Sequence, residues 1–327
     1  MNLWRVPIEE KSGKVLGTPE PLTTPSAYSG RLSISSNGRR IAYAQTTSTS
    51  NIHRIGFDPS AGKAVGQSVP ITQGSMQVST PDLSPDGGRL AFTKLGRQED
   101  IFVVKTDGTE LRQLTDDPHR DRGPRWSPDG KRIAFYSTRS GEYEAWAINP
   151  DGSALQQLTY ESRGSVTELA WSPDGTRLAY RISGIGPFLL EVGKSWKEQS
   201  PAALPPLGEP DAWFTVHEWS PDGRKLAGHR THADTSRRGI VIYSLESQAY
   251  QRLTDVGVWP RWLSDSRRLL FLYQGKIHLL DTRSGKVHEA LSVAPHAAGR
   301  FARSRDDRTL YFALRVTEGD IWLMNLE

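Results

Sequence analysis

The chain has no cysteine among its 327 residues. Disulfide bridges, thiolate metal ligands and cysteine nucleophiles are therefore excluded. A Gly-x-Ser-x-Gly motif, which marks the nucleophile of α/β-hydrolases, is also absent, and so is a glycine-rich phosphate-binding loop. No apolar run approaches the length that crosses a membrane. Each absence removes one class of chemistry from consideration.

Charge of neither sign dominates. The 41 Lys and Arg residues and the 37 Asp and Glu residues leave a net charge of +4. Because the two signs are interspersed, nucleic acid is not expected as a partner. Residues 1–7 lack the apolar core of a signal peptide. As written, the chain is expected to be cytoplasmic; as a piece of a larger exported or membrane-anchored protein, it is expected to be periplasmic.

What the chain does contain is a repeated motif. Its clearest copy, from Trp126 to Phe135, reads Trp-Ser-Pro-Asp-Gly-Lys-Arg-Ile-Ala-Phe. The Asp or Asn of each copy stands at position 37, 86, 129, 174, 222, 265 or 306, so the copies are 41 to 49 residues apart. A period of this length is typical of solenoids, propellers and arrays.

The motif predicts a β-hairpin. Proline favours the first central position of a β-turn, aspartate tolerates the second, and glycine supplies backbone freedom where the next strand starts. The alternating apolar residues that follow, such as Ile133 and Phe135, indicate a strand. The repeated Asp is therefore predicted to shape the turn, and we assign it no catalytic role.

Each repeat holds four strands, which the third copy shows at 124–126, 132–137, 144–148 and 155–159. Four antiparallel strands in a repeat of this length form the blade of a β-propeller. The chain is therefore predicted to be all-β, with residues 24–327 forming a single seven-bladed β-propeller of four-stranded antiparallel blades.

The last repeat has no outer strand of its own. Residues 1–23 are expected to close the ring, through a strand at 2–8 or at 19–23 that pairs with the last blade and removes an exposed edge. Eight segments resemble a third strand, so one is surplus to the seven blades. The Pro-rich stretch 194–210 is expected to be a rim loop or a distorted outer strand.

Most of the tryptophans follow the repeat. One slot, predicted to be blade core, is shared by Trp126, Trp171, Trp219 and Trp262. A second structural slot is shared by Trp4, Trp146 and Trp322. Outside both slots lie Trp196, Trp213 and Trp259. These three belong either to a contact surface, where tryptophan is common, or to the seams between blades.

The repeated Trp-Ser-Pro-Asp-Gly-x-x-Ile/Leu-Ala-Phe/Tyr, with its Asp-Ile-Phe/Trp and Leu-x-x-Leu-Thr strands, resembles the TolB-type WD40-like (PD40) propeller repeat over about residues 19–327. Residues 3–7 and 111–118 look most like the C-terminal propeller regions of bacterial kinases and winged-helix regulators. The resemblance implies a six- or seven-bladed propeller. It implies no single activity, because the family shares a fold rather than a function.

The innermost strands of a propeller line its channel, and the segments leading into them converge on one mouth. Read in register, these segments carry residues that suit ligand binding: Arg31, His119, Arg122, Glu168, His217, Trp259 and Arg300. The arginines can bind a carboxylate, a phosphate or a peptide terminus. Glu168 and His217 can hydrogen-bond a ligand or polarise a water.

Two functions follow. The first is a monomeric binding module that recognises a protein, peptide or small ligand at the channel mouth, with no cofactor, metal or chemistry, as the sensor region of a larger bacterial protein. The alternative is a propeller lyase or hydrolase that uses His119, Glu168 or His217, with or without a divalent metal. A further His-rich segment, from His229 to Asp234, is expected to be a solvated loop rather than a metal site.

Overall fold

The computed structural model describes residues 3–22, 29–234 and 238–325. Strands, turns and loops make up all of these ranges, and none of them contains a helix, so no membrane-spanning helix is found there. Two compact units result: Ser50–Leu314, and the residues up to Thr49 together with those from Arg315 onward. The all-β prediction is confirmed.

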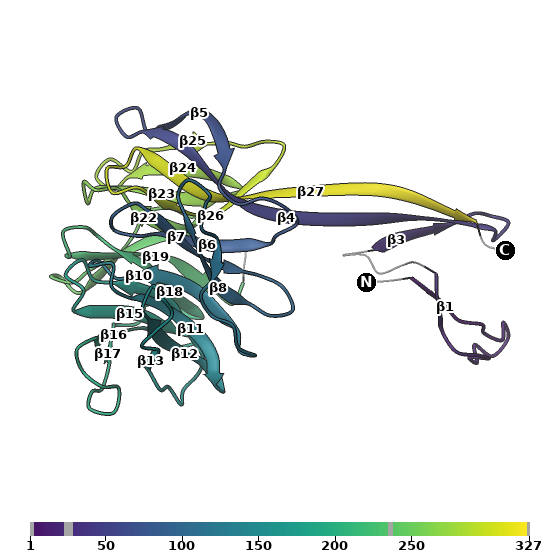
Figure 1. The fold of residues 1–327 in the computed structure, drawn as a ribbon, viewed down its shortest axis with the longest axis horizontal. Helices are drawn as coiled ribbons and strands as arrows, with labels where there is room; N and C mark the ends of the chain where they lie inside the picture. The colour runs from purple at the N-terminus through teal and green to yellow at the C-terminus, as the bar shows by residue number, and fades with distance from the viewer. Residues whose placement is uncertain (1–2, 23–28, 235–237, 326–327) are drawn as a thin grey trace. The chain divides into compact units, whose positions relative to one another are not determined.

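The larger unit is a β-propeller of four-stranded antiparallel blades (Figure 1). Five blades follow chain order, with the innermost strand first. They are β6 (Val78–Leu83), β7 (Arg89–Lys94), β8 (Asp100–Lys105) and β9 (Arg112–Gln113); β10 (Asp121–Trp126), β11 (Ile133–Ser140), β12 (Glu142–Ile148) and β13 (Gln156–Gln157); β14 (Val166–Trp171), β15 (Arg177–Ile182), β16 (Gly186–Glu191) and β17 (Ala202–Ala203); β18 (Ala212–Trp219), β19 (Lys225–His232), β20 (Ile240–Ser244) and β21 (Ala249–Arg252); and β22 (Val258–Trp262), β23 (Arg268–Tyr273), β24 (Lys276–Asp281) and β25 (Val287–Leu291).

The sixth blade combines both ends of the unit. Its inner strands are β26 (Ala297–Arg303) and the first part of β27 (Thr309–Asn325). Its outer strands are the last part of β4 (Arg40–Asp58) and β5 (Lys63–Pro70). The described residues thus form six blades rather than the expected seven, and the ring is closed by residues 50–70 rather than by 2–8 or 19–23.

The difference arises because two strands continue where turns were expected. β4 runs unbroken through Thr46–Thr49, a stretch of β-branched and serine residues that contains no turn-forming Gly, Pro or Asn. The equivalent connections within the ring bend at glycines with positive φ, such as Gly141 and Gly275. β27 likewise continues through Val316 and Thr317. The inner hairpin and the outer strands of the first repeat therefore belong to different compact units.

The smaller unit holds this leftover hairpin. There, β3 (Ser29–Ile34) pairs with the first part of β4, and β27 follows in the order of the sheet, while β1 (Trp4–Arg5) pairs with β2 (Glu20–Pro21). The β3–β4 turn repeats the ring turn in detail. Ser35 Oγ donates to Asn37 Oδ1 at 2.7 Å, as Ser127 Oγ donates to Asp129 Oδ1 at 2.6 Å in the ring.

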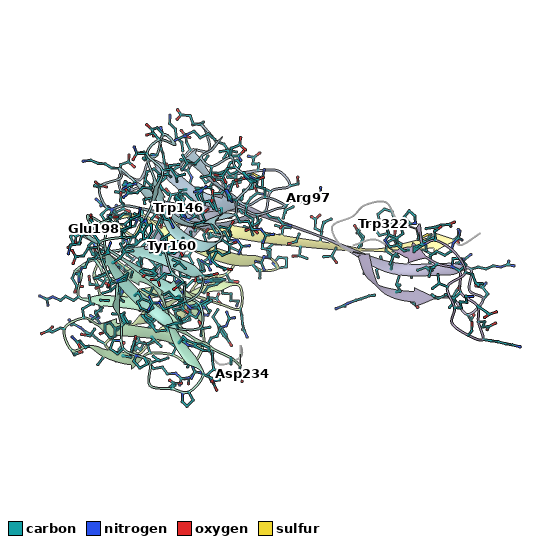
Figure 2. All side chains as sticks on the ribbon, turned by 90° about the horizontal axis from the view of Figure 1, so that it is seen from below. Arg97, Trp146, Tyr160, Glu198, Asp234 and Trp322 are labelled. Carbon is teal, nitrogen blue, oxygen red and sulfur yellow. The ribbon has the colours of Figure 1, made fainter. Side chains whose placement is uncertain are left out.

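Burial separates this sheet from the blades. In the ring, Trp126, Trp219 and Trp262 are buried as predicted, and Trp171 is half-buried. The second tryptophan slot was only partly predicted, because Trp146 packs against the core whereas Trp322 is 50% exposed (Figure 2). Beside Trp322, Ile321 is 84% exposed, yet Ile101, its counterpart in the ring, is fully buried.

This contrast gives a paired prediction. Ile101→Ala should lower the free energy of unfolding of the propeller by about 2–5 kcal/mol, because it leaves a cavity between blades. Ile321→Ala should change it by less than about 0.5 kcal/mol, because Ile321 is exposed. Denaturant unfolding of both variants provides the check. Equal losses would show that residues 320–325 pack as a blade in solution.

Candidate functional site

The inner strands of the ring carry a β-bulge near the end where the chain enters them. The pairing register shifts between Ser79 and Asp82 in β6 and between Thr167 and Ala170 in β14. The bulged residues Glu168 and Trp259 have φ of 53° and 54°, values that non-glycine residues seldom adopt. A bulge re-aims the side chain that it carries and is common beside functional sites.

An ion pair crosses the channel at this level. Arg300 of β26 forks onto Glu168 of β14, with Nη2 2.5 Å from Oε1 and Nη1 3.0 Å from Oε2. Both side chains are largely buried, and the Arg300 guanidinium also lies 4.5 Å from the ring centre of Trp259. Burial opposes the charge of Glu168, but Arg300 and His217 outweigh it and hold the pKa of Glu168 well below its usual value. The carboxylate is therefore ionised at neutral pH.

A pair of stacked histidines continues from the carboxylate. His217 Nδ1 lies 3.2 Å from Glu168 Oε2, although the angle is poor for a hydrogen bond. His217 Nε2 lies 2.7 Å from His229 Nδ1, and His229 Nε2 lies 3.3 Å from Thr231 Oγ1. When both rings are neutral, one tautomer of each is compatible with these contacts, and in it His229 Nδ1–H donates to His217 Nε2.

Burial keeps both rings neutral. It lowers the pKa of His217 to about 4, although Glu168 acts in the opposite direction. Burial, reinforced by His217, lowers the pKa of His229 well below the ordinary value. The histidines therefore link Glu168 to the second strand of the neighbouring blade without adding a charge at neutral pH.

Beside Arg300, the channel mouth holds a cavity of about 610 Å³, called here the mouth cavity. Its lining includes Arg122, Tyr136 and Arg300, with the hydroxyls of Thr80 and Thr93. Burial raises the pKa of Tyr136 to about 12, so its phenol stays protonated at neutral pH. The cavity thus combines guanidinium and hydroxyl groups.

Arg122 is fixed in a similar way to Arg300. Its Nη2 donates to Glu99 Oε1 at 2.6 Å, Glu99 is only 8% exposed, and the guanidinium lies 5.6 Å from the ring centre of Tyr143. The bond to Glu99 raises the pKa of Arg122 further above its already high value. Two charged donors are therefore held at one cavity by carboxylates behind them.

The structure brings together five of the seven residues selected from the sequence: Arg122, Glu168, His217, Trp259 and Arg300. His119 precedes β10, where its backbone N–H donates to Asp117 Oδ1 at 3.0 Å, and it does not line the mouth cavity. Arg31 occupies the equivalent bulge, with φ of 53°, but in β3 of the smaller unit. That these residues bind a ligand stays a prediction.

Sequence reasoning missed three members of the site. Tyr136 lies on a strand and Glu99 lies in a loop, and the comparison of the segments leading into the inner strands included neither position. His229 was placed in a solvated loop, but it is buried in β19 against His217. The alternation of side chains along the strand that contains His229 could have predicted that this residue is buried. Within the described residues, no group of three His, Cys, Asp or Glu side chains has the arrangement of a metal site.

Residues 15–197, more than half of the chain, match the PD40 family, the TolB beta propeller domain. The chain belongs to this family. The TolB-type repeat inferred from the motif is therefore confirmed.

Relatives of this TolB-type propeller differ in activity. The Tol-Pal system protein TolB of Zymomonas mobilis is 37% identical over 83 residues, covering 25% of this chain and 18% of that protein. Dipeptidyl-peptidase 5 of Porphyromonas gingivalis is 23% identical over 289 residues, covering 70% of this chain and 42% of the peptidase. The chain thus matches less than half the length of either relative.

A solved structure gives the same fold. The putative TolB from Agrobacterium tumefaciens superposes with a TM-score of 0.64 at 14% identity, over 82% of this chain and 99% of that one. At this identity the likeness concerns the fold alone. Function must be argued from the site.

The buried histidines predict a pH dependence. The pKa of His217 falls from 6.5 to about 4 on folding, so the unfolded state binds more protons between these values. Stability should therefore be complete above about pH 6.5 and decrease by roughly 2–3 kcal/mol on lowering the pH to about 4.5. Glu168 extends the loss to still lower pH, since its pKa is depressed in the folded state.

Denaturant unfolding at each pH measures this loss. His217→Gln should weaken the dependence without abolishing it, because glutamine does not titrate whereas His229, whose pKa burial also lowers, still does. His232→Gln, which alters a histidine outside the pair, should retain it. If the free energy of unfolding of His217→Gln depended on pH as it does in the wild type, the histidine pair would not be the source of the dependence.

Proposed function

We propose that this TolB-type propeller is a binding module that recognises a protein, peptide or small ligand at the mouth cavity, and that it serves as the sensor region of a larger bacterial protein. The observation that carries the proposal is the pair of arginines, Arg122 and Arg300, which face one cavity of about 610 Å³. Each is held from behind by a buried carboxylate.

Such an arrangement suits recognition because it is preorganised. A guanidinium that donates to one carboxylate keeps further N–H groups for a ligand, and the ion pair fixes its direction. Little side-chain entropy then remains to be lost on binding. The best-matched ligand groups are acceptors, such as a carboxylate or a row of peptide carbonyls.

The properties of His217 favour binding over catalysis. Its side chain is only 1% exposed, and its two ring nitrogens face Glu168 and His229. A pKa of about 4 makes it a weak base at neutral pH, and a general base must also reach the proton that it abstracts. The alternative, a lyase or hydrolase built on Glu168 and His217, is therefore the weaker proposal.

The names of two relatives support a protein or peptide ligand, since one is a protein of the Tol-Pal system and the other is a dipeptidyl-peptidase. We propose a monomer as the working form of the chain.

Isothermal titration with a defined panel tests the proposal: free dipeptides and tripeptides, uronic acids and divalent metal chlorides. For any peptide or uronic acid that binds, Arg122→Gln should weaken affinity about tenfold or more, because a charged donor is lost from the cavity. Arg252→Gln, which removes an arginine of outer strand β21, is the matched control. Equal affinities for the wild type and Arg122→Gln would place the ligand elsewhere.

The same mixtures separate binding from catalysis. After long incubation, chromatography should recover the bound probe unchanged. Appearance of a product that depends on the intact protein and disappears in His217→Gln would overturn the proposal in favour of the enzyme.

A further inference from the structure

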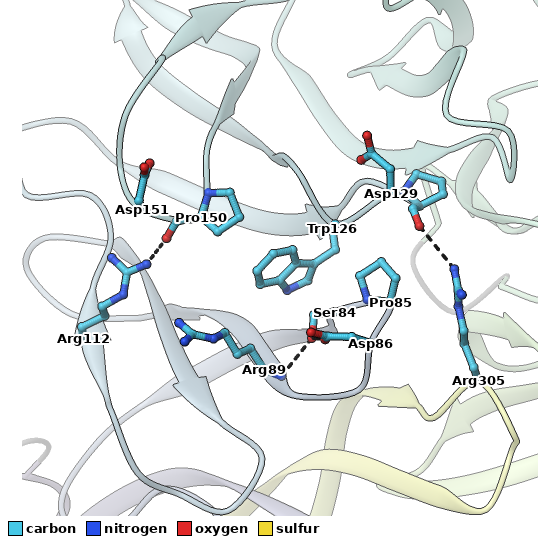
Figure 3. Close-up of a pocket in the computed structure, with 12 residues that line it drawn as sticks. Ser84, Pro85, Asp86, Arg89, Arg112, Trp126, Asp129, Pro150, Asp151 and Arg305 are labelled. Carbon is cyan, nitrogen blue, oxygen red and sulfur yellow. Dashed lines mark hydrogen bonds between the residues drawn. The ribbon is translucent and has the colours of Figure 1, made fainter.

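A second cavity, of about 630 Å³, lies at the other end of the inner strands, beside the strand-connecting turns. It is called here the turn-face cavity. Its lining comes from the first two blades of the ring, which meet around Trp126, and from Arg305 of the sixth blade (Figure 3). None of the residues of the mouth cavity takes part in it.

The indole of Trp126 is unlike its counterparts in the next two repeats. Trp171 Nε1 donates to Arg125 O at 3.1 Å, and Trp219 Nε1 donates to Ala170 O, also at 3.1 Å. Trp126 is 8% exposed and its Nε1, like that of Trp262 in the same slot of a later repeat, is buried without a hydrogen-bond partner. Figure 3 shows this nitrogen directed toward the turn at Ser84 and Asp86. A buried donor with no acceptor is costly and rare.

Two cations at the cavity also lack a carboxylate partner. The guanidinium of Arg112 donates to the carbonyl oxygen of Pro150, and that of Arg305 donates to Pro128 O at 3.3 Å. Within the described residues, neither makes an ion pair, whereas the third cation, Arg89, lies 3.3 Å from Glu110. Both guanidinium groups therefore donate to carbonyl oxygens rather than to a carboxylate, although Asp151 is near enough for Arg112 to help lower its pKa.

The carboxylates of the cavity are engaged within their own turns. Asp86 Oδ1 accepts from Ser84 Oγ at 2.5 Å and from Gly88 N at 3.0 Å. Asp129 Oδ1 does the same with Ser127 and Lys131. These bonds hold the pKa of each carboxyl below its usual value. The hydrogen-bonding groups of the cavity that remain available to a ligand are therefore donors.

The remaining walls are apolar. The rings of Pro85 and Pro150 lie beside the indole of Trp126 (Figure 3), and Pro128 also lines the cavity. Proline and tryptophan surfaces of this kind bind extended peptide segments, because the walls pack against side chains while a donor receives a backbone carbonyl. Small inorganic anions would leave these walls uncovered.

We propose that the turn-face cavity binds an extended acidic peptide segment of a partner protein, independently of the mouth cavity. One carboxylate of the segment pairs with Arg112 and another, farther along the segment, pairs with Arg305, because the two arginines lie on opposite sides of the cavity (Figure 3). Between them, apolar side chains of the segment lie on the proline rings and on the indole of Trp126. The ligand thus supplies the acceptors that the cavity lacks.

The repeat offers variants that spare the fold. Arg112→Gln introduces the residue that the next repeat has at the same slot, Gln156. Arg305→Gln removes the charge of an exposed side chain on the other side of the cavity. Arg177→Gln alters an arginine that occupies the slot of Arg89 one blade beyond the cavity, and it is the matched control.

The test is fluorescence anisotropy with a dye-labelled, blocked peptide of alternating glutamate, leucine and proline, competed with its glutamine counterpart and with inorganic phosphate. We expect the glutamate peptide to bind, Arg112→Gln and Arg305→Gln each to weaken its binding about tenfold or more, and Arg177→Gln to leave its binding unchanged. Circular dichroism confirms that each variant is folded.

Three results would overturn the proposal: equal binding of the glutamine peptide, full competition by phosphate alone, or unaltered affinity in both variants. Arg122→Gln separates this site from the mouth cavity, since it should leave binding of the acidic peptide intact. If Arg122→Gln and not Arg112→Gln abolishes binding, the peptide occupies the mouth cavity and the turn-face proposal fails.

Discussion

The innermost strand of every blade has a sheet neighbour on one side only, and its other edge faces the channel. Because buried backbone groups must be paired, side chains from the adjacent blade supply the missing partners. Asp82 accepts from Trp126 N at 2.8 Å, and Glu218 accepts from Trp262 N at 2.5 Å, each one blade onward. Arg125 Nε donates in the same sense to Leu169 O at 3.1 Å. This requirement places charged residues inside the ring.

The mouth is built on the same requirement. A bulge interrupts inner strands such as β14 and β22, and at Glu168 and Trp259 it holds the backbone at positive φ. Glu168 then receives Arg300 from the far side of the ring, and the neutral histidines lie behind it. Local strain and buried charge are tolerated because the blades around them are fixed. The consequence is a cavity whose donors point outward in set directions.

The sequence predicted the parts of the fold that each repeat determines alone. Turn chemistry, strand alternation and the tryptophan slot are local, and they gave the blade, its order of strands and most of its core. The number of blades depends on whether β4 and β27 bend or continue, which is a competition between sheets far apart in sequence. Residues 46–49 carry no turn signal, and the prediction relied on the period instead.

The candidate site was likewise predictable only where the repeat alone determines it. Register placed Glu168 and Arg300 in equivalent slots and His217 one residue closer to its turn, and such slots of a ring meet at its mouth, so their proximity followed from the repeat. His229 lies on the second strand and Glu99 before the third strand of another blade, and only the tertiary structure brings them to His217 and Arg122. Arg31 carries the correct local signal in a hairpin that lies outside the ring.

A double-mutant cycle on Glu168 and Arg300 tests most directly whether buried charge holds the mouth together across the ring. Glu168→Gln and Arg300→Gln should each cost about 3–5 kcal/mol of stability, because each leaves a buried charge without its partner. The double variant should cost clearly less than the two added together, with a coupling above roughly 1 kcal/mol. Additive losses, within about 0.5 kcal/mol, would contradict the account, since they would mean that the two residues do not meet in solution.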